Sequence, residues 1–293
     1  MNIGILAVDS SYPNLALMKI SAWHKARGDN VEWHNGLCHY DKVYASKVFS
    51  FTPDYGYYIN ADQVEKGGTG YDISKVLPVE VDRIIPDYDL YNIDKTLAYG
   101  FLTRGCPNRC KWCVVPKKEG NIAAYMDIEE IAVNGRKSII LMDNNILASD
   151  YGLQQIEKII RLKLRVDFNQ GLDARQIARN PQIAELLSRV KWMRYIRMAY
   201  DSTAVRDDVR KAIERLKKCG MKPAKMFFYV LVRDVDDALA RIEELDALGC
   251  QPFAQPYRDF ENKIRPTPEQ RRLARWCNHK PTFHTVNYKN YKE

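Results

Sequence analysis

Apolar and polar positions near the start of the chain follow first a strand period and then a helical one. Residues 2–9 form an apolar run of strand length, and residues 12–28 have the spacing of an amphipathic helix that ends at a glycine. Two further strand patterns and a glycine-rich turn follow at residues 30–35, 42–51 and 67–72. This order predicts a small Rossmann-like βαβ domain over residues 1–76.

A regular alternation of strands and helices begins after a less ordered segment. Residues 77–96 are rich in Pro, Asp and Tyr and lack a sustained period, which is typical of a linker. Six strand patterns then cover residues 97–103, 137–143, 164–170, 193–200, 225–232 and 251–258, with amphipathic helical stretches between them. Such strands pair in parallel through right-handed crossovers. The α/β pattern therefore predicts a partial (β/α)6 barrel over residues 97–260, with its active end at the carboxyl ends of the strands.

The last segment, residues 261–293, is basic and aromatic. It holds eight Lys or Arg and three Glu, a net charge of +5 within a chain of net charge +8. Four aromatic residues lie among these charges, Trp276, Phe283, Tyr288 and Tyr291. Basic groups neutralise phosphates and rings stack on bases, so this extension is a candidate nucleic-acid surface. The alternative is a solvated helix, capped at Thr267, and a strap that packs its aromatic side chains on the domain.

The composition bears on the compartment and on the cysteines. No run of about 18 apolar residues occurs. Residues 1–20 also lack the basic flank and the cleavage site of a signal peptide. We therefore expect a cytoplasmic protein that does not enter a membrane. Thiols stay reduced in that compartment, so the seven cysteines are expected to be metal ligands or buried apolar side chains.

Three cysteines lie close together in "CPNRCKWC", directly after the first predicted barrel strand. Cys106, Cys110 and Cys113 have the spacing Cys-x3-Cys-x2-Cys. Zinc ribbons instead pair two Cys-x2-Cys knuckles, and the chain has no second knuckle. Cys219 and Cys250 each adjoin a glycine that ends a helix, which favours buried small side chains. Three thiolates can hold a four-iron, four-sulfur (4Fe-4S) cluster and leave one iron open for another ligand.

The motif "CPNRCKWC" resembles the signature of the radical S-adenosylmethionine (SAM) superfamily, whose fold is a partial (β/α)6 barrel. The glycine-rich "GGTGYD", the "PDYDLY" linker and the "DNN" after the second barrel strand are similar to the branch with an N-terminal cobalamin-binding-like domain. The resemblance implies a 4Fe-4S cluster whose open iron binds SAM, with electrons from a flavodoxin- or ferredoxin-type reductant. Reductive cleavage of SAM in this family produces a 5′-deoxyadenosyl radical that abstracts hydrogen from a substrate.

The resemblance also implies roles for residues at matching positions. Cys106, Cys110 and Cys113 would ligate the cluster, and the backbone of Trp112 would lie against the adenine of SAM. Polar residues at the ends of the barrel strands are candidates to bind SAM or substrate, namely Asp143, Asn144, Asn145, Asn169, Gln170, Arg197 and Asp201. Carboxylate and amide oxygens accept hydrogen bonds from an ammonium group, and the planar fork of an Arg pairs with a carboxylate. No residue is assigned a catalytic role.

Ordinary structural explanations stand beside these roles. The "DNN" segment is also typical of a strand-to-helix turn with an Asn cap. Asp173 and Arg175 can pair with each other or cap the following helix. Arg197 can form a buried ion pair with an Asp.

Two departures from the family leave the reaction open. Cobalamin domains that bind through a histidine use an Asp-x-His-x-x-Gly loop, whereas "DSSYPN" follows the first strand here, so cobalamin is expected only without a histidine ligand. Methylthiotransferases, which share a related layout, carry three more N-terminal cysteines, whereas only Cys38 precedes this motif. The alternatives are a cobalamin-dependent methylase, a methylthiotransferase-like RNA modification enzyme, or a metal-containing nucleic-acid-binding or electron-transfer module. Polar strand ends around a barrel favour an enzyme of unidentified substrate, for which a nucleic acid is a candidate.

Overall fold

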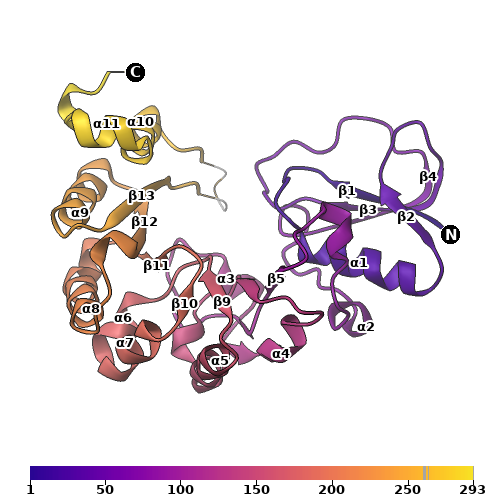
Figure 1. Ribbon diagram of the computed structural model, residues 1–293. Coiled ribbons are helices and arrows are strands. Elements are labelled where there is room, and N and C mark those ends of the chain that lie inside the picture. The colour runs from indigo at the N-terminus through magenta and orange to yellow at the C-terminus, as the bar shows by residue number, and fades with distance from the viewer. Residues whose placement is uncertain (260–261, 263, 293) are drawn as a thin grey trace. The chain divides into compact units, whose positions relative to one another are not determined.

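The computed structural model describes residues 1–259, 262 and 264–292 (Figure 1). Residues 261, 263 and 293 of the predicted C-terminal extension therefore lie outside the described residues. The chain divides into two compact units. The first holds Met1–Ala98 with Val133–Arg136, and the second holds Tyr99–Ala132 with Lys137–Glu293.

The first unit is built on a four-stranded parallel sheet. In spatial order its strands are β2 (Asn30–Trp33), β1 (Asn2–Ala7), β3 (Tyr40–Ser46) and β4 (Ala61–Gly67). Apolar side chains of the two central strands, such as Ile3 and Val43, are fully buried. Helix α1 (Leu15–Ala26) connects β1 to β2 and begins at Asn14, whose side chain accepts hydrogen bonds from two backbone N–H groups of the first turn.

The sequence pattern missed one strand and simplified one segment of this unit. Strand β4 has mostly exposed polar and charged residues, because it lies at the edge of the sheet, and it carries little apolar signal. Residues 77–96, predicted as a linker, contain the short helix α2 (Val79–Asp82) and the 3-10 helix η1 (Tyr88–Tyr91). Both belong to the first compact unit.

The second unit contains two parallel sheets and a short hairpin. One sheet has the spatial order β10 (Lys191–Trp192), β9 (Arg165–Phe168), β8 (Ser138–Leu141) and β5 (Leu97–Gly100), of which β5 begins with two residues of the first unit. The other has the order β11 (Ile196–Ala199), β12 (Met226–Val232) and β13 (Gln251–Pro256). An isolated parallel bridge between Leu172 and Met198 links them. The hairpin pairs β6 (Thr103–Arg104) with β7 (Ala123–Ala124).

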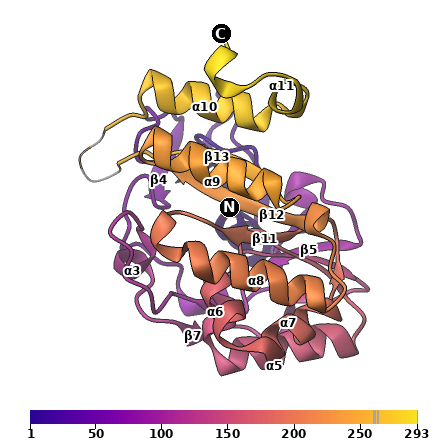
Figure 2. The ribbon, with the colours of Figure 1, turned by 90° about the vertical axis from the view of Figure 1, so that its left-hand side faces the viewer.

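Helices alternate with these strands, as the apolar pattern predicts. They are α3 (Val115–Lys118), α4 (Ile128–Ile131), α5 (Asp150–Arg161), α6 (Ala174–Arg179), α7 (Pro181–Ser188), α8 (Arg206–Lys218) and α9 (Val235–Ala247). Helices α8 and α9 lie on one side of the β11–β13 sheet (Figures 1 and 2), and Phe228 and Val230 of β12 are fully buried. Each of the six predicted strand segments contains a strand. The α/β class with parallel sheets is thereby confirmed, and the partial barrel stays a prediction.

The C-terminal extension packs on the second unit. It forms α10 (Pro268–Asn278), α11 (Lys280–Thr285) and the 3-10 helix η5 (Tyr288–Asn290). Thr267 caps α10 as predicted, within a capping box completed by Gln270. The ring of Trp276 lies 4.9 Å from that of Phe283 and 5.3 Å from that of Tyr288, measured between centroids, and all three residues are buried. These three rings therefore belong to a small core, as the structural alternative predicted, and are not free to stack on bases.

The extension also covers an edge of the β11–β13 sheet. The side-chain amide of Asn278 accepts a hydrogen bond from the N–H of Ala254 (2.8 Å) and donates one to its carbonyl oxygen (2.9 Å). This pairing satisfies backbone groups that an edge strand would otherwise leave open. Within the part of the chain that the structure describes, no helix has the length and apolarity to span a membrane.

Candidate functional site

The cysteine motif occupies the loop between β6 and β7. Arg104 donates to both carboxylate oxygens of Glu119 (3.1 and 2.6 Å), and Glu119 also accepts the backbone N–H of Gly105 (3.0 Å). Gly105 has a φ of +82°, and a side chain there would collide with the carbonyl oxygen of Asn121. A glycine is therefore required directly before Cys106, where the chain turns into the loop.

The three thiols of the motif are free and partly buried. Burial raises the pKa of both Cys110 and Cys113. The charge of Arg175 opposes this increase at Cys110, whereas Cys106 raises the pKa of both thiols and Cys110 also raises that of Cys113. The three sulfur atoms are thus close enough to influence one another. Among the described residues, however, no three His, Cys, Asp or Glu side chains are arranged to hold a metal ion.

Asn145, four residues after β8 ends, lies against the motif. Its Nδ2 is 3.5 Å from the Cys106 sulfur and donates to a carboxylate oxygen of Asp173 (3.1 Å). The residue is 2% exposed, and its Oδ1 is buried without a hydrogen-bond partner among the described residues. A buried amide oxygen left unpaired costs about 1–3 kcal/mol. This atom is therefore suited to accept a hydrogen bond from a ligand.

Asp173, which follows β9, approaches the same loop. Its carboxylate pairs with Arg175 in a bidentate ion pair (2.8 and 2.9 Å) and accepts a hydrogen bond from Nδ2 of Asn108 (3.0 Å). It also caps α6. Burial by itself would raise the pKa of this carboxyl, but the hydrogen bonds and the charge of Arg175 hold it below its usual value. Both structural alternatives expected for Asp173, the ion pair and the helix cap, are confirmed.

Trp112 lies near the carboxyl ends of strands β12 and β13. The guanidinium carbon of Arg233, which directly follows β12, lies 4.8 Å from the centroid of the Trp112 ring. It lies 5.8 Å from the ring of Tyr257, which directly follows β13. A cation over an aromatic face is attractive, so Arg233 joins the cysteine loop to the ends of two strands.

Asp201 approaches from the end of β11. Burial raises the pKa of its carboxyl, and the positive charges of Arg241 and Arg175 oppose that increase. Its own negative charge contributes to the raised pKa of Cys110 and Cys113. Side chains that follow β8, β9 and β12 contact one loop, as expected for the carboxyl ends of parallel strands.

Asp143 and Asn144 make contacts that support the loop rather than contacts with the thiols. Asp143 is 4% exposed and accepts hydrogen bonds from the backbone of Leu102 (3.1 Å) and from the N–H and hydroxyl of Thr103 (2.5 and 2.7 Å). Burial raises the pKa of Asp143 to about 6, in spite of these hydrogen bonds. Asn144 donates to Glu119 (2.7 Å). Their roles in SAM binding stay predictions.

Arg197 forms an ion pair with an Asp, which was the structural alternative to a contact with the carboxylate of SAM. It donates to both oxygens of Asp167 (2.7 and 2.9 Å) and lies 3.4 Å from the hydroxyl of Tyr229. That hydroxyl donates to the backbone carbonyl of Asn169 (2.8 Å), whereas Gln170 is exposed. A contact between Arg197 and the carboxylate of SAM stays a prediction, as do SAM or substrate contacts of Asn169 and Gln170.

Four residues of this site were not expected from the sequence, Asn108, Glu119, Asp167 and Arg233. Asn108 lies inside the cysteine motif, and this position was the signal from which its place at the site could have been predicted. The partners of the other three are between 14 and 121 residues away in sequence, and no local pattern marks such pairs.

The residues of the motif fit a 4Fe-4S cluster by their chemistry. Three free thiols lie in one loop, and a buried amide oxygen without a partner lies beside Cys106. In the first unit, the loop at which a cobalamin ligand would be expected has its acidic side chain already engaged. Asp9, in the loop after β1, accepts hydrogen bonds from the backbone N–H groups of Val48 and Phe49 (both 2.8 Å), so its carboxylate is already occupied. Cobalamin binding without a protein ligand stays a prediction.

Comparison with known proteins yields a partial similarity. No model of a known protein family matches the chain. The chain is similar to the ribosomal protein uS12 methylthiotransferase RimO of Synechococcus sp. (strain RCC307), with 28% identity over 109 residues. The match covers 35% of this chain and 22% of that protein, so the chain spans less than a quarter of the relative's length.

Proposed function

We propose that this protein is a radical SAM enzyme. The observation that carries the proposal is that side chains following three parallel strands, β8, β9 and β12, contact the Cys-x3-Cys-x2-Cys loop. Active sites of parallel α/β folds lie at the carboxyl ends of the strands. The partial similarity to a methylthiotransferase, a class with a related layout, supports the same chemistry.

The proposed architecture is a partial barrel made from both sheets of the second unit. Strands β5, β8 and β9 are followed by β10 and β11, which lie three residues apart, and then by β12 and β13. The bridge between Leu172 and Met198 continues the pairing across the break between the sheets. The parallel order along the chain is the order that right-handed crossovers produce.

Cys106, Cys110 and Cys113 would hold the cluster. When bound, a cluster of this kind supplies the electron that cleaves SAM. The unpaired Oδ1 of Asn145 would accept a hydrogen bond from the ammonium of SAM, and Asp173 would keep the amide in that orientation through its bond to Nδ2. Trp112 and Arg233 would cover the loop on the side of β12 and β13.

Anaerobic reconstitution with iron and sulfide tests the proposal. We expect about four iron atoms per chain and a reducible cluster whose electron paramagnetic resonance spectrum changes when SAM is added. Replacing Cys106, Cys110 and Cys113 by Ala should abolish the cluster and the formation of 5′-deoxyadenosine. The matched control replaces Cys38 and Cys219, which lie outside the motif, by Ala. This variant should retain both the cluster and the formation of 5′-deoxyadenosine. A reducible cluster whose spectrum ignores SAM would point instead to an electron-transfer module and would contradict the proposal.

Methylthio transfer is a second candidate, favoured by the similarity to RimO. Methylthiotransferases, which this chain resembles in layout, hold a second cluster on three further N-terminal cysteines. In this chain Cys38 is the one cysteine that precedes the motif. The iron content separates the two readings, because a second cluster would roughly double the iron bound per chain.

A further inference from the structure

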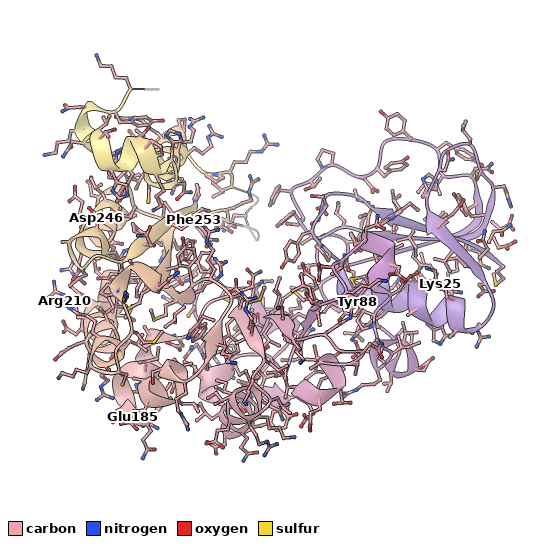
Figure 3. The ribbon with its side chains drawn as sticks, in the orientation of Figure 1. Lys25, Tyr88, Glu185, Arg210, Asp246 and Phe253 are labelled. Atoms are coloured by element: carbon pink, nitrogen blue, oxygen red, sulfur yellow. The ribbon has the colours of Figure 1, made fainter. Side chains whose placement is uncertain are left out.

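One side of the β11–β13 sheet carries aromatic rings that helices α8 and α9 do not cover. On β12, Phe228 and Val230 are fully buried, whereas the alternate residues Phe227 and Tyr229 are partly exposed. Phe253 of β13 pairs in register with Tyr229. Figure 3 places Phe253 on the side of the sheet away from Arg210 of α8 and Asp246 of α9. The sheet thus has one side packed on helices and one aromatic side.

We call Tyr195, Phe227, Tyr229 and Phe253 the aromatic face. The centroid of Phe227 lies 5.5 Å from that of Tyr195 and 5.6 Å from that of Phe253, with interplanar angles of 29° and 30°. Tyr195 and Phe253 are therefore each inclined by about 30° to Phe227, and Tyr229 meets Phe227 in a T-shaped contact at 5.2 Å. All four are partly exposed, so they offer a surface on which a planar ring can stack.

Polar contacts hold the aromatic face in place. The ion pair of Arg197 with Asp167 sets the guanidinium carbon 5.0 Å from the centroid of Phe227. The hydroxyl of Tyr229 is fixed by its bond to the carbonyl of Asn169. A preorganised surface loses little conformational entropy when a ligand binds.

Strands β12 and β13, which carry Phe227, Tyr229 and Phe253, lead from the aromatic face to residues at the cysteine loop. Tyr229 precedes Arg233 by four residues on β12 and its continuation, and Phe253 precedes Tyr257 by four residues on β13 and its continuation. Arg233 contacts both Tyr257 and Trp112 of the cysteine motif. A ligand stacked on the face would therefore extend toward the loop.

The basic C-terminal extension is attached beside Phe253. Asn278 pairs with the backbone of Ala254, and Lys280 donates to the carbonyl of Pro252 (3.0 Å), so both chain neighbours of Phe253 hold the extension. Five Lys or Arg side chains are exposed among the described residues of the extension, Arg265, Arg271, Arg275, Lys289 and Lys292. A basic segment attached to the strand that carries Phe253 matches the chemistry of a single-stranded nucleic acid, in which phosphates and flat bases alternate.

We propose that the aromatic face binds an unpaired base of a single-stranded nucleic acid and presents it to the cysteine loop. The phosphates on either side of that base meet the basic extension. The presentation of the base for chemistry rests on the proposed radical SAM function, whereas binding of the strand does not.

Binding of short fluorescent single-stranded RNA and DNA to the full-length protein without a cluster tests this proposal. We expect Phe227→Leu and, separately, Phe253→Leu to weaken binding about tenfold, since base–aromatic stacking is lost. Phe49→Leu, at an exposed aromatic residue of the first unit, is the control and should bind as the unsubstituted protein does. Circular dichroism melting checks that each variant folds. Because Phe227→Leu and Phe253→Leu are made separately, the test still works if one of the two variants does not fold.

Two further readouts separate stacking from a structural effect. A 2-aminopurine base in the strand should lose fluorescence on binding, and Phe227→Leu should restore most of it. Replacing Arg271 and Lys289 by Ala should reduce the slope of log affinity against log salt by about 1.4. Affinities of folded Phe227→Leu and Phe253→Leu within twofold of the original would overturn the proposal. So would a protein that binds an unstructured polypeptide through Phe227 and binds no oligonucleotide.

The outcomes also separate this proposal from the proposed function. A protein that cleaves SAM but binds no oligonucleotide would refute the nucleic-acid surface alone. A protein that binds oligonucleotides through the aromatic face, and whose cluster ignores SAM, would refute the radical SAM assignment alone. Comparison of the RNA and DNA affinities identifies the natural strand.

Discussion

Single residues of the site divide into those held by the protein itself and those with unused bonding capacity. Asp143, Asn144, Asp173 and Arg197 have their polar groups engaged by protein partners. Asn145 differs, because its buried Oδ1 has no partner in the described chain. Residues of the first kind set the shape of the loop, and Asn145 is the residue best suited to meet a ligand.

The Asp143 carboxyl makes a prediction about pH. Its pKa in the folded protein, about 6, lies above the ordinary value of 3.8. Between these values the folded protein binds a proton that the unfolded chain has released, so the free energy of unfolding should fall as pH rises. The slope for this group is at most about 1.4 kcal/mol per pH unit. Asp143→Asn keeps an acceptor for Thr103 and should remove that part of the slope in urea denaturation between pH 4 and 6. An unchanged slope would mean that Asp143 does not titrate in this range.

At the scale of elements, helix α10 shows how a locally encoded helix completes a sheet. Its capping box and the proline at its first position are encoded within four residues, Thr267 to Gln270. Asn278 at its other end pairs with the edge of β13. The helix therefore forms for local reasons and covers the sheet edge for tertiary ones.

Removal of the cap should be measurable. Thr267→Ala deletes the hydroxyl that accepts the N–H of Gln270 (3.2 Å) and should lower the free energy of unfolding of the second unit by about 1 kcal/mol. Thr267→Ser keeps the hydroxyl and serves as the control, with an expected change near zero. Equal losses in both variants would show that packing of the threonine methyl group, rather than the cap, stabilises the helix.

At the scale of the whole molecule, two compact units have separate cores. Ile5 lies in the first and Phe228 in the second, and neither side chain is exposed. Compact units of this kind can unfold separately. The site and the aromatic face both belong to the second unit.

This division predicts different results for two core substitutions. Ile5→Ala and Phe228→Ala should each destabilise their own unit by about 2–5 kcal/mol. In urea, Ile5→Ala should lower the midpoint of unfolding of the first unit and leave reconstitution of the cluster intact. Phe228→Ala should abolish reconstitution at the same urea concentrations. Loss of the cluster in both variants at one common midpoint would show that the units unfold as one.

Locally encoded features were determined by the sequence alone. The spacing of Cys106, Cys110 and Cys113 within eight residues, the cap at Thr267 and the alternation of strands with helices all depend on neighbours in the chain. Their physical causes, such as capping bonds and the periodicity of apolar faces, act over one or two turns. Strand β4 was the main failure, because an exposed edge strand needs little apolar periodicity.

Pairings between distant residues were decided only by the tertiary structure. The choice of Asp167 as the partner of Arg197, 30 residues away, depends on which strands lie side by side. The same is true of Asn145 and Cys106, 39 residues apart, and of the contact between Arg233 and Trp112. The sequence could predict that polar groups stand at the ends of parallel strands. Which of them bond to each other, and which oxygen is left for a ligand, follows from strand order and burial, because a buried polar group must find its partner in space.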